Sequence, residues 1–307
     1  MKKWLGIDIG GTFIKYGVVN ENYQIEKHWK IPTPEIRHKD EFFDYICANM
    51  EACKEEVYGI GVCSPGLIDS DYVIQTFIVP KLDPIRGSNI AKEIASRTGN
   101  KVTVINDAKA AGLCELKLGN AQGTQSSASF IIGTGIGGCI CNREDVVYGV
   151  DGFAGEFHFI PYITDEEKQQ VWKRGRVSSV QGLVDIYNSR VTEEQQVKYG
   201  HEVTALYLTG DELTGKIMDE WLFKIAVHLL SVTVSLNPEV ICIGGGISEE
   251  KWFLKALKKK YQGLCMDIFQ GIDFLHTRII PCKYRNDSNL LGAILKFEIE
   301  EKKERAD

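Results

Sequence analysis

The chain has 307 residues, a length typical of two domains of ordinary size. It is 44% apolar and 25% charged, which excludes a disordered chain, a collagen-like repeat and a small disulfide-bonded scaffold. Its 36 Lys and Arg residues against 42 Asp and Glu give a net charge of −6, without the basic excess typical of nucleic-acid binders.

The N-terminal residues reach Asp8 before any apolar run attains the length of a signal peptide. No run of about 18 uninterrupted apolar residues occurs, so no membrane-spanning helix is expected. The nine cysteines are scattered and include no Cys-x-x-Cys pair. The sequence therefore predicts a cytoplasmic protein with reduced cysteines and neither a membrane nor a nucleic acid as partner.

Two glycine-rich segments share a pattern. Gly10-Gly11-Thr12 and Gly133-Thr134-Gly135 each stand between two short β-prone runs, an arrangement that predicts a β-hairpin. At one constant offset the identical residues are Gly6 and Gly133, Ile9 and Ile136, Gly10 and Gly137, and Gly11 and Gly138. A hairpin at the start of each half of the chain predicts two related domains.

The second glycine segment also matches the dinucleotide-binding fingerprint Gly-x-Gly-x-x-Gly. That fingerprint requires a helix to begin at the glycines, whereas a strand-like run follows Gly138, so NAD binding is rejected. Glycine turns let backbone N–H groups approach phosphate oxygens, and Thr12 and Thr134 add hydroxyl donors. Two copies favour phosphate binding over turns that serve the hairpins alone.

The remaining segments alternate strands and helices, which is typical of an α/β fold. The predicted strands are residues 58–63, 101–105 and 240–243, and the predicted helices are residues 87–98, 107–118, 211–236 and 248–260. Residues 244–246 join a strand to a helix through glycines. Because a helix N-terminus favours anions, this junction is a second candidate nucleotide site.

Two aspartates are candidates for chemistry. Asp107 lies at a predicted strand-to-helix junction, where it could cap the helix or act as a general base toward a hydroxyl that attacks phosphorus. Asp8 stands beside the first glycine turn, where a carboxylate near phosphate implies an intervening Mg²⁺. The alternative for Asp8 is a buried ion pair with Lys15.

Glu156 and His158 follow the second predicted hairpin, in a loop rich in glycine and aromatic residues. Polar side chains in such a loop are suited to bind the hydroxyl groups of a ligand. The alternative is that both side chains lie on the surface.

Six motifs, taken in chain order, resemble those of the ROK family of repressors, uncharacterised open reading frames and sugar kinases. They are Asp8-Ile9-Gly10-Gly11-Thr12, Ser64-Pro65-Gly66, Asn106-Asp107-Ala108, Gly133-Thr134-Gly135-Ile136-Gly137-Gly138, Ala154-Gly155-Glu156 and Ile243-Gly244-Gly245-Gly246-Ile247. With Leu290-Leu291-Gly292-Ala293 the resemblance covers nearly the whole chain.

The resemblance implies an α/β protein with the two-domain actin-like ATPase (ribonuclease H-like) fold and a ligand cleft between the domains. The smaller domain would comprise residues 1–118 and 288–307, and the larger domain residues 119–287. It also implies a homodimer that transfers a phosphoryl group from ATP to a hexose hydroxyl, usually at C6 of glucose or a glucoside.

The resemblance assigns a general-base role to Asp107. It further implies phosphate binding by Gly10, Gly11, Thr12, Thr134 and Gly135, adenosine contacts at Gly245 and Gly246, Mg²⁺ near Asp8 through water, and sugar binding by Gly66, Asn106, Asp107, Glu156 and His158.

Three departures from the family pattern concern the sugar. Most members have Glu-x-Gly-His, but a gap-free match places Phe159 at the histidine, and His158 fills that role only in a loop one residue shorter. No cysteine lies between Cys141 and Cys242, so the family's Cys-x-Cys-Gly-x-x-Gly-Cys zinc site is not expected. Residues 168–192 also lack the sugar-binding Glu that trails this motif. Zinc-free members of the family include β-glucoside kinases and some acyl-hexosamine kinases. A pocket with fewer charged side chains and an extra aromatic ring would accept a larger or less polar sugar.

A glucose or β-glucoside kinase is the leading hypothesis, and an acyl-hexosamine kinase of the N-acetylmannosamine type is the first alternative. A sugar-responsive repressor is disfavoured, because the first hairpin begins at Trp4 and leaves no room for a preceding DNA-binding domain. A regulatory sugar-binding protein without catalysis is disfavoured by the presence of Asp107 and both glycine turns.

Overall fold

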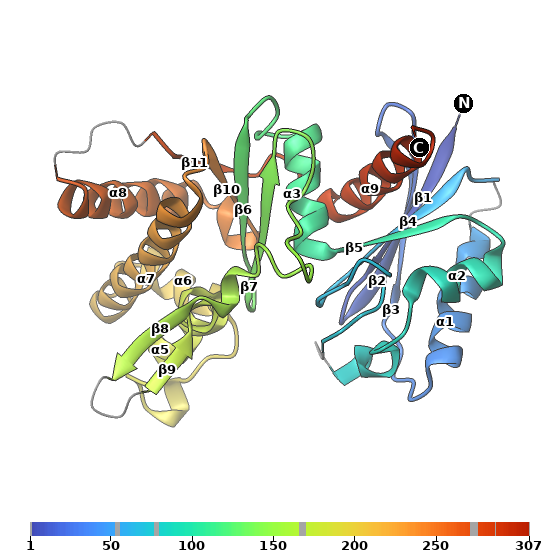
Figure 1. The fold of residues 1–307 in the computed structure, drawn as a ribbon. Helices are drawn as coiled ribbons and strands as arrows, with labels where there is room; N and C mark the ends of the chain where they lie inside the picture. Colours follow the sequence, from blue (N-terminus) through green and yellow to red (C-terminus); the bar gives the residue numbers. More distant parts are fainter. Residues whose placement is uncertain are drawn as a thin grey trace. The chain divides into compact units, whose positions relative to one another are not determined.

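The computed structural model describes residues 2–52, 56–76, 80–165, 170–270, 276–285 and 287–306. The chain divides into two compact units (Figure 1). Unit 1 comprises Met1–Gly119, Asp145–Ala154 and Tyr284–Asp307, and unit 2 comprises Asn120–Glu144 and Gly155–Lys283. The chain thus returns to unit 1 at residues 145–154. The predicted boundaries do not include this return, because they place residues 119–287 in one domain.

Unit 1 is built on a five-stranded sheet in the order β3-β2-β1-β4-β5. Its strands are β1 (Lys3–Ile9), β2 (Phe13–Asn20), β3 (Ile25–Pro32), β4 (Gly59–Ser64) and β5 (Val102–Asn106). β1 and β2 form an antiparallel hairpin, whereas β1, β4 and β5 run parallel. The carboxyl ends of these three parallel strands consequently meet at one edge of the sheet.

Helices cover both faces of this sheet. They are α1 (Lys39–Ala48), α2 (Ile90–Thr98), α3 (Asp107–Lys117) and α9 (Ser288–Glu304), with the 3₁₀ turns η1 (Asn49–Ala52) and η2 (Pro80–Ile85). The core side chains of α1 and α2 pack with Leu5 and Ile7 of β1. α9 lies against β1, β4 and α3 (Figure 1). This contact depends on glycine, since a Cβ on Gly61 or Gly292 would collide with a backbone carbonyl oxygen.

Unit 2 contains a four-stranded sheet in the order β11-β10-β6-β7. Its strands are β6 (Ser126–Ile132), β7 (Ile136–Asn142), β10 (Val240–Gly244) and β11 (Arg278–Pro281), and a separate hairpin consists of β8 (Pro161–Asp165) and β9 (Gln170–Lys173). β6 and β7 are antiparallel, and β6, β10 and β11 are parallel. The sheet thus repeats the arrangement of β1, β2, β4 and β5 in unit 1.

The helical part of unit 2 surrounds the longest described helix. Its elements are η3 (Phe157–Phe159), α4 (Arg174–Ser178), α5 (Val180–Asn188), η4 (Glu193–Gln195), α6 (Gly200–Leu208), α7 (Glu212–Leu236), η5 (Gly246–Glu249) and α8 (Lys251–Ile268). Trp221, Ile225 and Leu229 of α7 are fully buried in the core that also holds Phe130 of β6. None of the described helices is long and apolar enough to cross a membrane.

Both predicted hairpins are confirmed, but the residue match that suggested the repeat is out of register. It pairs Gly10 and Gly11 of the first turn with Gly137 and Gly138, which lie inside β7, whereas the second turn is Gly133-Thr134-Gly135. Gly138 serves packing instead, because a Cβ there would collide with Gly155 and the ring of Phe157. Glycine identity alone therefore aligned a packing position with a turn.

The other predicted elements are present with small shifts at their ends. The helix predicted at residues 248–260 is wrong at both ends, since α8 runs from Lys251 to Ile268. Its start is displaced because Gly245, at a φ of 88°, opens a 3₁₀ turn. The amide and the hydroxyl of Ser248 both donate to the Gly245 carbonyl, at 3.0 and 2.7 Å.

Gly292→Ala is expected to destabilise unit 1 by about 1–3 kcal/mol, because the new methyl group must push α9 away from the Ala110 carbonyl of α3. Gly263→Ala is the matched control: a Cβ on this α8 glycine would meet no atom within 4 Å, so alanine should stabilise by up to about 1 kcal/mol. Urea denaturation would measure both, and equal effects would contradict the packing argument.

Candidate functional site

Asp8 is buried in unit 1 beside the first glycine turn and is paired with Lys15. The two residues are cross-strand partners on β1 and β2, and Lys15 Nζ lies 3.0 Å from Asp8 Oδ2. Cys63 Sγ donates to the other oxygen, Oδ1, at 3.5 Å. Burial, with the charges of Asp8 and Asp107, raises the pKa of the Cys63 thiol, which keeps its proton for this contact. Of the two sequence-based alternatives for Asp8, the structure shows the ion pair.

Asp107 is the first residue of α3, but it does not cap that helix. Asn106 is the N-cap, and its Oδ1 accepts from the backbone N–H of Lys109 at 3.1 Å. Asn106 Nδ2 also donates to the Gly66 carbonyl at 2.9 Å. The capping interpretation of Asp107 is therefore wrong. Its half-buried carboxylate accepts from Ala108 N–H at 2.8 Å, at a helix end that stabilises negative charge.

The turn formed by Gly10, Gly11 and Thr12 is fastened from one side by Thr33. The Thr33 amide donates to the Thr12 carbonyl at 3.0 Å, and its hydroxyl donates to the Gly10 carbonyl at 2.6 Å. Gly10 N–H donates to Phe13 at 3.1 Å, so this amide is used inside the hairpin. Gly10 can therefore let a ligand approach the backbone closely, but its N–H is not a donor for that ligand. The side chain of Thr12 is exposed.

These residues of unit 1 lie at the carboxyl ends of parallel strands. The strand register pairs Asp8 with Cys63 and Ser64 with Asn106, so Asp8, Gly66, Asn106 and Asp107 share one edge of the sheet. Sequence reasoning missed Thr33 and Cys63. Cys63 directly precedes Ser64-Pro65-Gly66, which was a usable signal, whereas nothing in the local sequence singles out Thr33.

In unit 2 the second glycine turn lies next to the glycines that follow β10. β10 is parallel to β6, and Gly245 packs so tightly on the Ile132 carbonyl that a Cβ would collide with it. Thr134 and Gly135 are exposed, and a Cβ on Gly246 would meet no atom within 4 Å. The structure therefore brings the predicted phosphate turn and the predicted adenosine glycines together, although about a hundred residues separate them in the chain.

Glu156 and His158 flank Phe157 at the start of η3 and face one another. His158 Nδ1 lies 3.6 Å from Glu156 Oε2, and the ring centroids of His158 and Phe159 are 3.9 Å apart. The Glu156 side chain is 13% exposed and that of His158 is 34% exposed. The structure thus places a carboxylate, an imidazole and an aromatic ring in one accessible turn of unit 2.

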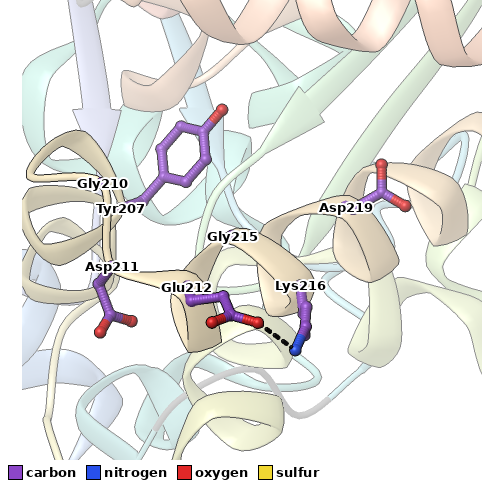
Figure 2. A pocket seen from close by; sticks show the side chains of 7 residues that line it. All are labelled: Tyr207, Gly210, Asp211, Glu212, Gly215, Lys216 and Asp219. Atoms are coloured by element: carbon purple, nitrogen blue, oxygen red, sulfur yellow. Dashed lines mark hydrogen bonds and ion pairs between the residues drawn. The ribbon is translucent and has the colours of Figure 1, made fainter.

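A cavity of about 670 Å³ at the junction of α6 and α7 contains none of the predicted residues (Figure 2). Asp211 caps α7 there through Thr214 N–H at 2.7 Å, and Glu212 pairs with Lys216 at 2.7 Å. These polar groups are engaged in helix stabilisation. Among the predicted site residues, Asn106 lines a second cavity of about 230 Å³, in unit 1.

Across the described ranges, no group of three or more His, Cys, Asp or Glu side chains is placed to hold a metal ion. None of the eight cysteines within these ranges forms a disulfide with another of them, and Cys53 lies outside the described residues.

Two α/β units with corresponding sheets, each with a glycine turn at the hairpin, define the class of the actin-like ATPase fold. The sequence model of the ROK family matches residues 4–298. The chain therefore belongs to the ROK family, and the predicted fold class is confirmed.

Three relatives cover nearly the full chain. A glucokinase of Halalkalibacterium halodurans is 26% identical over 94% of this chain and 93% of its own. An N-acetyl-D-glucosamine kinase of Photobacterium profundum is 26% identical over 94% and 97%. A β-glucoside kinase of Listeria monocytogenes is 28% identical over 97% and 98%.

Solved structures agree with this assignment. A ROK family protein of Streptococcus pneumoniae in complex with sucrose has a TM-score of 0.85 at 25% identity, covering 98% of this chain and 99% of its own. A ROK family glucokinase of Streptomyces griseus in complex with glucose and AMPPNP has a TM-score of 0.76 at 24% identity, covering 95% and 97%.

Replacing Asn106 is expected to separate its two structural tasks. Asn106→Ala removes the cap of α3 and the bond to Gly66, so the free energy of unfolding should fall by about 2 kcal/mol. Asn106→Ser keeps a capping oxygen but is too short to reach Gly66, so it should lose about half as much. Urea denaturation measures both: equal losses would show that the cap contributes nothing, and no loss in Asn106→Ser would show that the Gly66 bond contributes nothing.

Proposed function

We propose that the protein is an ATP-dependent sugar kinase that phosphorylates a hexose or hexoside hydroxyl, at C6, with Asp107 as the general base. The observation that carries this proposal is the position of Asp107. It stands at the N-terminus of α3 without serving as its cap, because Asn106 performs that task. Membership in a family with sugar-kinase relatives supports the same reaction.

In the proposed step, the Asp107 carboxylate accepts the proton of the sugar hydroxyl as its oxygen attacks the γ-phosphorus of ATP. A new bond forms between that oxygen and phosphorus, the bond between the γ-phosphorus and the β–γ bridging oxygen breaks, and ADP leaves. The surrounding contacts restrict the movement of Asp107: Ala108 N–H binds its Oδ1, and Asn106 fixes the start of α3. This restraint serves positioning, from which much of the rate in phosphoryl transfer comes.

For ATP we propose Thr12 and Gly11 in unit 1, and Thr134, Gly135, Gly245 and Gly246 in unit 2. Gly10 is assigned to close backbone approach, because its amide is already bonded to Phe13. The adjacency of the second turn to Gly245, across β6 and β10, supports joint recognition of phosphates and adenosine. Gly135 and Gly246 suit a nucleotide because they carry no Cβ atom, which leaves space for the nucleotide to approach the backbone.

Mg²⁺, when bound with ATP, would neutralise charge on the phosphates and favour departure of ADP. Asp8 is the residue we assign to it, through water. Among the described residues, the donor to Oδ1 is the weak thiol of Cys63, which leaves acceptor capacity on this oxygen, while Lys15 binds Oδ2. The absence of zinc stays a prediction.

For the sugar we propose Glu156 and His158 from unit 2 and Gly66 and Asn106 from unit 1. The exposed ring of Phe159, tilted by 39° against the ring of His158, offers an apolar surface in the same turn as the Glu156 carboxylate. A ring there suits the apolar face of a sugar or an attached group. We therefore favour glucose or a β-glucoside. An N-acetylhexosamine, of the N-acetylmannosamine type, is the alternative, which relatives such as the N-acetyl-D-glucosamine kinase support.

The homodimer and the cytoplasmic location also stay predictions. Light scattering coupled to size-exclusion chromatography would test the first, and cell fractionation the second.

Asp107→Asn is expected to lower kcat by about a hundredfold to ten-thousandfold, because the amide cannot accept the hydroxyl proton. ADP formation would be followed by coupled NADH oxidation with Mg-ATP and glucose, mannose, fructose, N-acetylglucosamine, N-acetylmannosamine, cellobiose or an aryl β-glucoside. ATP affinity should stay within about twofold, since the substitution removes no proposed ATP contact.

Asp211→Asn is the matched control for that variant. It makes the same chemical change at the α7 cap beside the pocket of Figure 2, where Asn caps as well as Asp, so activity should be unchanged. Full activity in Asp107→Asn would overturn the base assignment. A wild type that is silent on every sugar of the panel but still binds ATP would indicate a regulatory sugar-binding protein or a sugar outside the panel.

Glu156→Gln is expected to raise the KM for the sugar by about tenfold, because a charged hydrogen bond to a sugar hydroxyl becomes a neutral one. The KM for ATP should not change. Glu193→Gln in the exposed turn η4 provides the control for the loss of one negative charge in unit 2. An unchanged sugar KM in Glu156→Gln would remove Glu156 from the proposed sugar site.

A further inference from the structure

A buried imidazole lies directly beneath the turn that carries Glu156 and His158. His228 of α7 is fully buried, and its Nε2 is 3.0 Å from the Phe157 carbonyl oxygen. Its Nδ1 is 2.9 Å from Ser178 Oγ, at the end of α4. One ring therefore joins η3, α4 and α7, three segments that come from distant parts of the sequence.

The hydrogen-bond partners determine which nitrogen of His228 carries the proton. The Phe157 carbonyl can only accept, so Nε2 must carry hydrogen. Burial lowers the pKa of His228 to about 3, so the ring is neutral at physiological pH and Nδ1 accepts from the Ser178 hydroxyl. That hydroxyl also lies 2.6 Å from the Arg174 carbonyl, so its single hydrogen serves two acceptors.

The far end of the same turn is held by α4. Arg174 N–H donates to the Ile160 carbonyl at 2.6 Å, and Arg174 Nη1 donates to Val227 of α7 at 3.1 Å. Gly175 packs directly on His158, where a Cβ would collide with the His158 side chain. The turn is thus fastened at Phe157 and at Ile160, on either side of His158.

We propose that His228 is a positioning residue for the sugar: through the Phe157 carbonyl it holds the turn so that Glu156 and His158 keep one orientation. The inference rests on the proposed function, since it takes Glu156 and His158 as the residues that contact the sugar. A neutral donor suits this task, because a charged ring at that depth would carry a large desolvation cost. Ser178 acts through His228, by orienting its ring.

The test compares four variants of the full chain. His228→Leu removes the bond to Phe157, His228→Gln retains an N–H donor, and Ser178→Ala removes the bond to Nδ1. Tyr261→Phe is the matched control: it breaks the buried 2.7 Å bond between Tyr261 and Thr233 of α7, away from the turn. In His228→Leu the sugar KM should rise about tenfold while kcat and the KM for ATP stay within about twofold.

His228→Gln is expected to restore most of the sugar affinity that His228→Leu loses. Ser178→Ala should raise the sugar KM less than His228→Leu does, because the bond between His228 and Phe157 survives in Ser178→Ala. Tyr261→Phe should leave all three constants unchanged. A sugar KM in His228→Leu no higher than in Tyr261→Phe overturns the proposal, as does a failure of His228→Gln to recover affinity. If His228→Leu does not fold, Ser178→Ala against Tyr261→Phe decides the question in the same way.

A second readout needs no substrate. The amides of Phe159 and Ile160 donate within the turn, to Glu156 at 3.1 Å and to Phe157 at 3.0 Å. Their hydrogen exchange should accelerate about tenfold in His228→Leu and not in Tyr261→Phe. Unchanged exchange overturns the anchoring role even in an active enzyme. A wild type inactive on every sugar would contradict the proposed function alone, and the exchange rates would still decide whether His228 holds the turn.

Discussion

Parallel pairing between strands distant in sequence is the constraint on which the rest of this molecule depends. In unit 1 the ladder β1–β4–β5 aligns Asp8 with Cys63 and Ser64 with Asn106. In unit 2 the ladder β6–β10–β11 places the turn after β6 beside Gly245. Because parallel strands end at the same edge, residues that no local pattern connects become neighbours there. The grouping of the candidate site residues in each unit is therefore a consequence of strand order.

Glycine makes this arrangement possible through two different physical effects. At Gly61, Gly138 and Gly292 the missing Cβ lets a helix, a ring or a backbone pack closer than any side chain would allow. At Gly245 a φ of 88° turns the chain sharply after β10. In the sequence the two uses look identical. This is why a match of glycines paired a turn with the interior of β7, although the repeat of hairpins itself was real.

Charge is handled differently at three polar positions in the two units. Asp8 is compensated by Lys15, while Asn106 takes over the capping bond and leaves Asp107 at the helix end. His228 is kept neutral, so that it can donate to a carbonyl without a buried charge. Each arrangement satisfies buried polar groups at low electrostatic cost.

The sequence by itself determined the strands of both hairpins, the strands β4, β5 and β10, the helices α2, α3 and α7 and, through the order of six motifs, the family. These depend on periodicity, caps and turn residues, which are interactions within a few residues of chain. Only the tertiary structure decided that Asn106 caps α3, that Gly10 N–H is used within its turn, that residues 145–154 return to unit 1 and that His228 supports the turn at Phe157. Contacts such as that between His228 and Phe157 join residues 71 positions apart. Their partners are selected by packing of the whole core, which no local pattern in the sequence records.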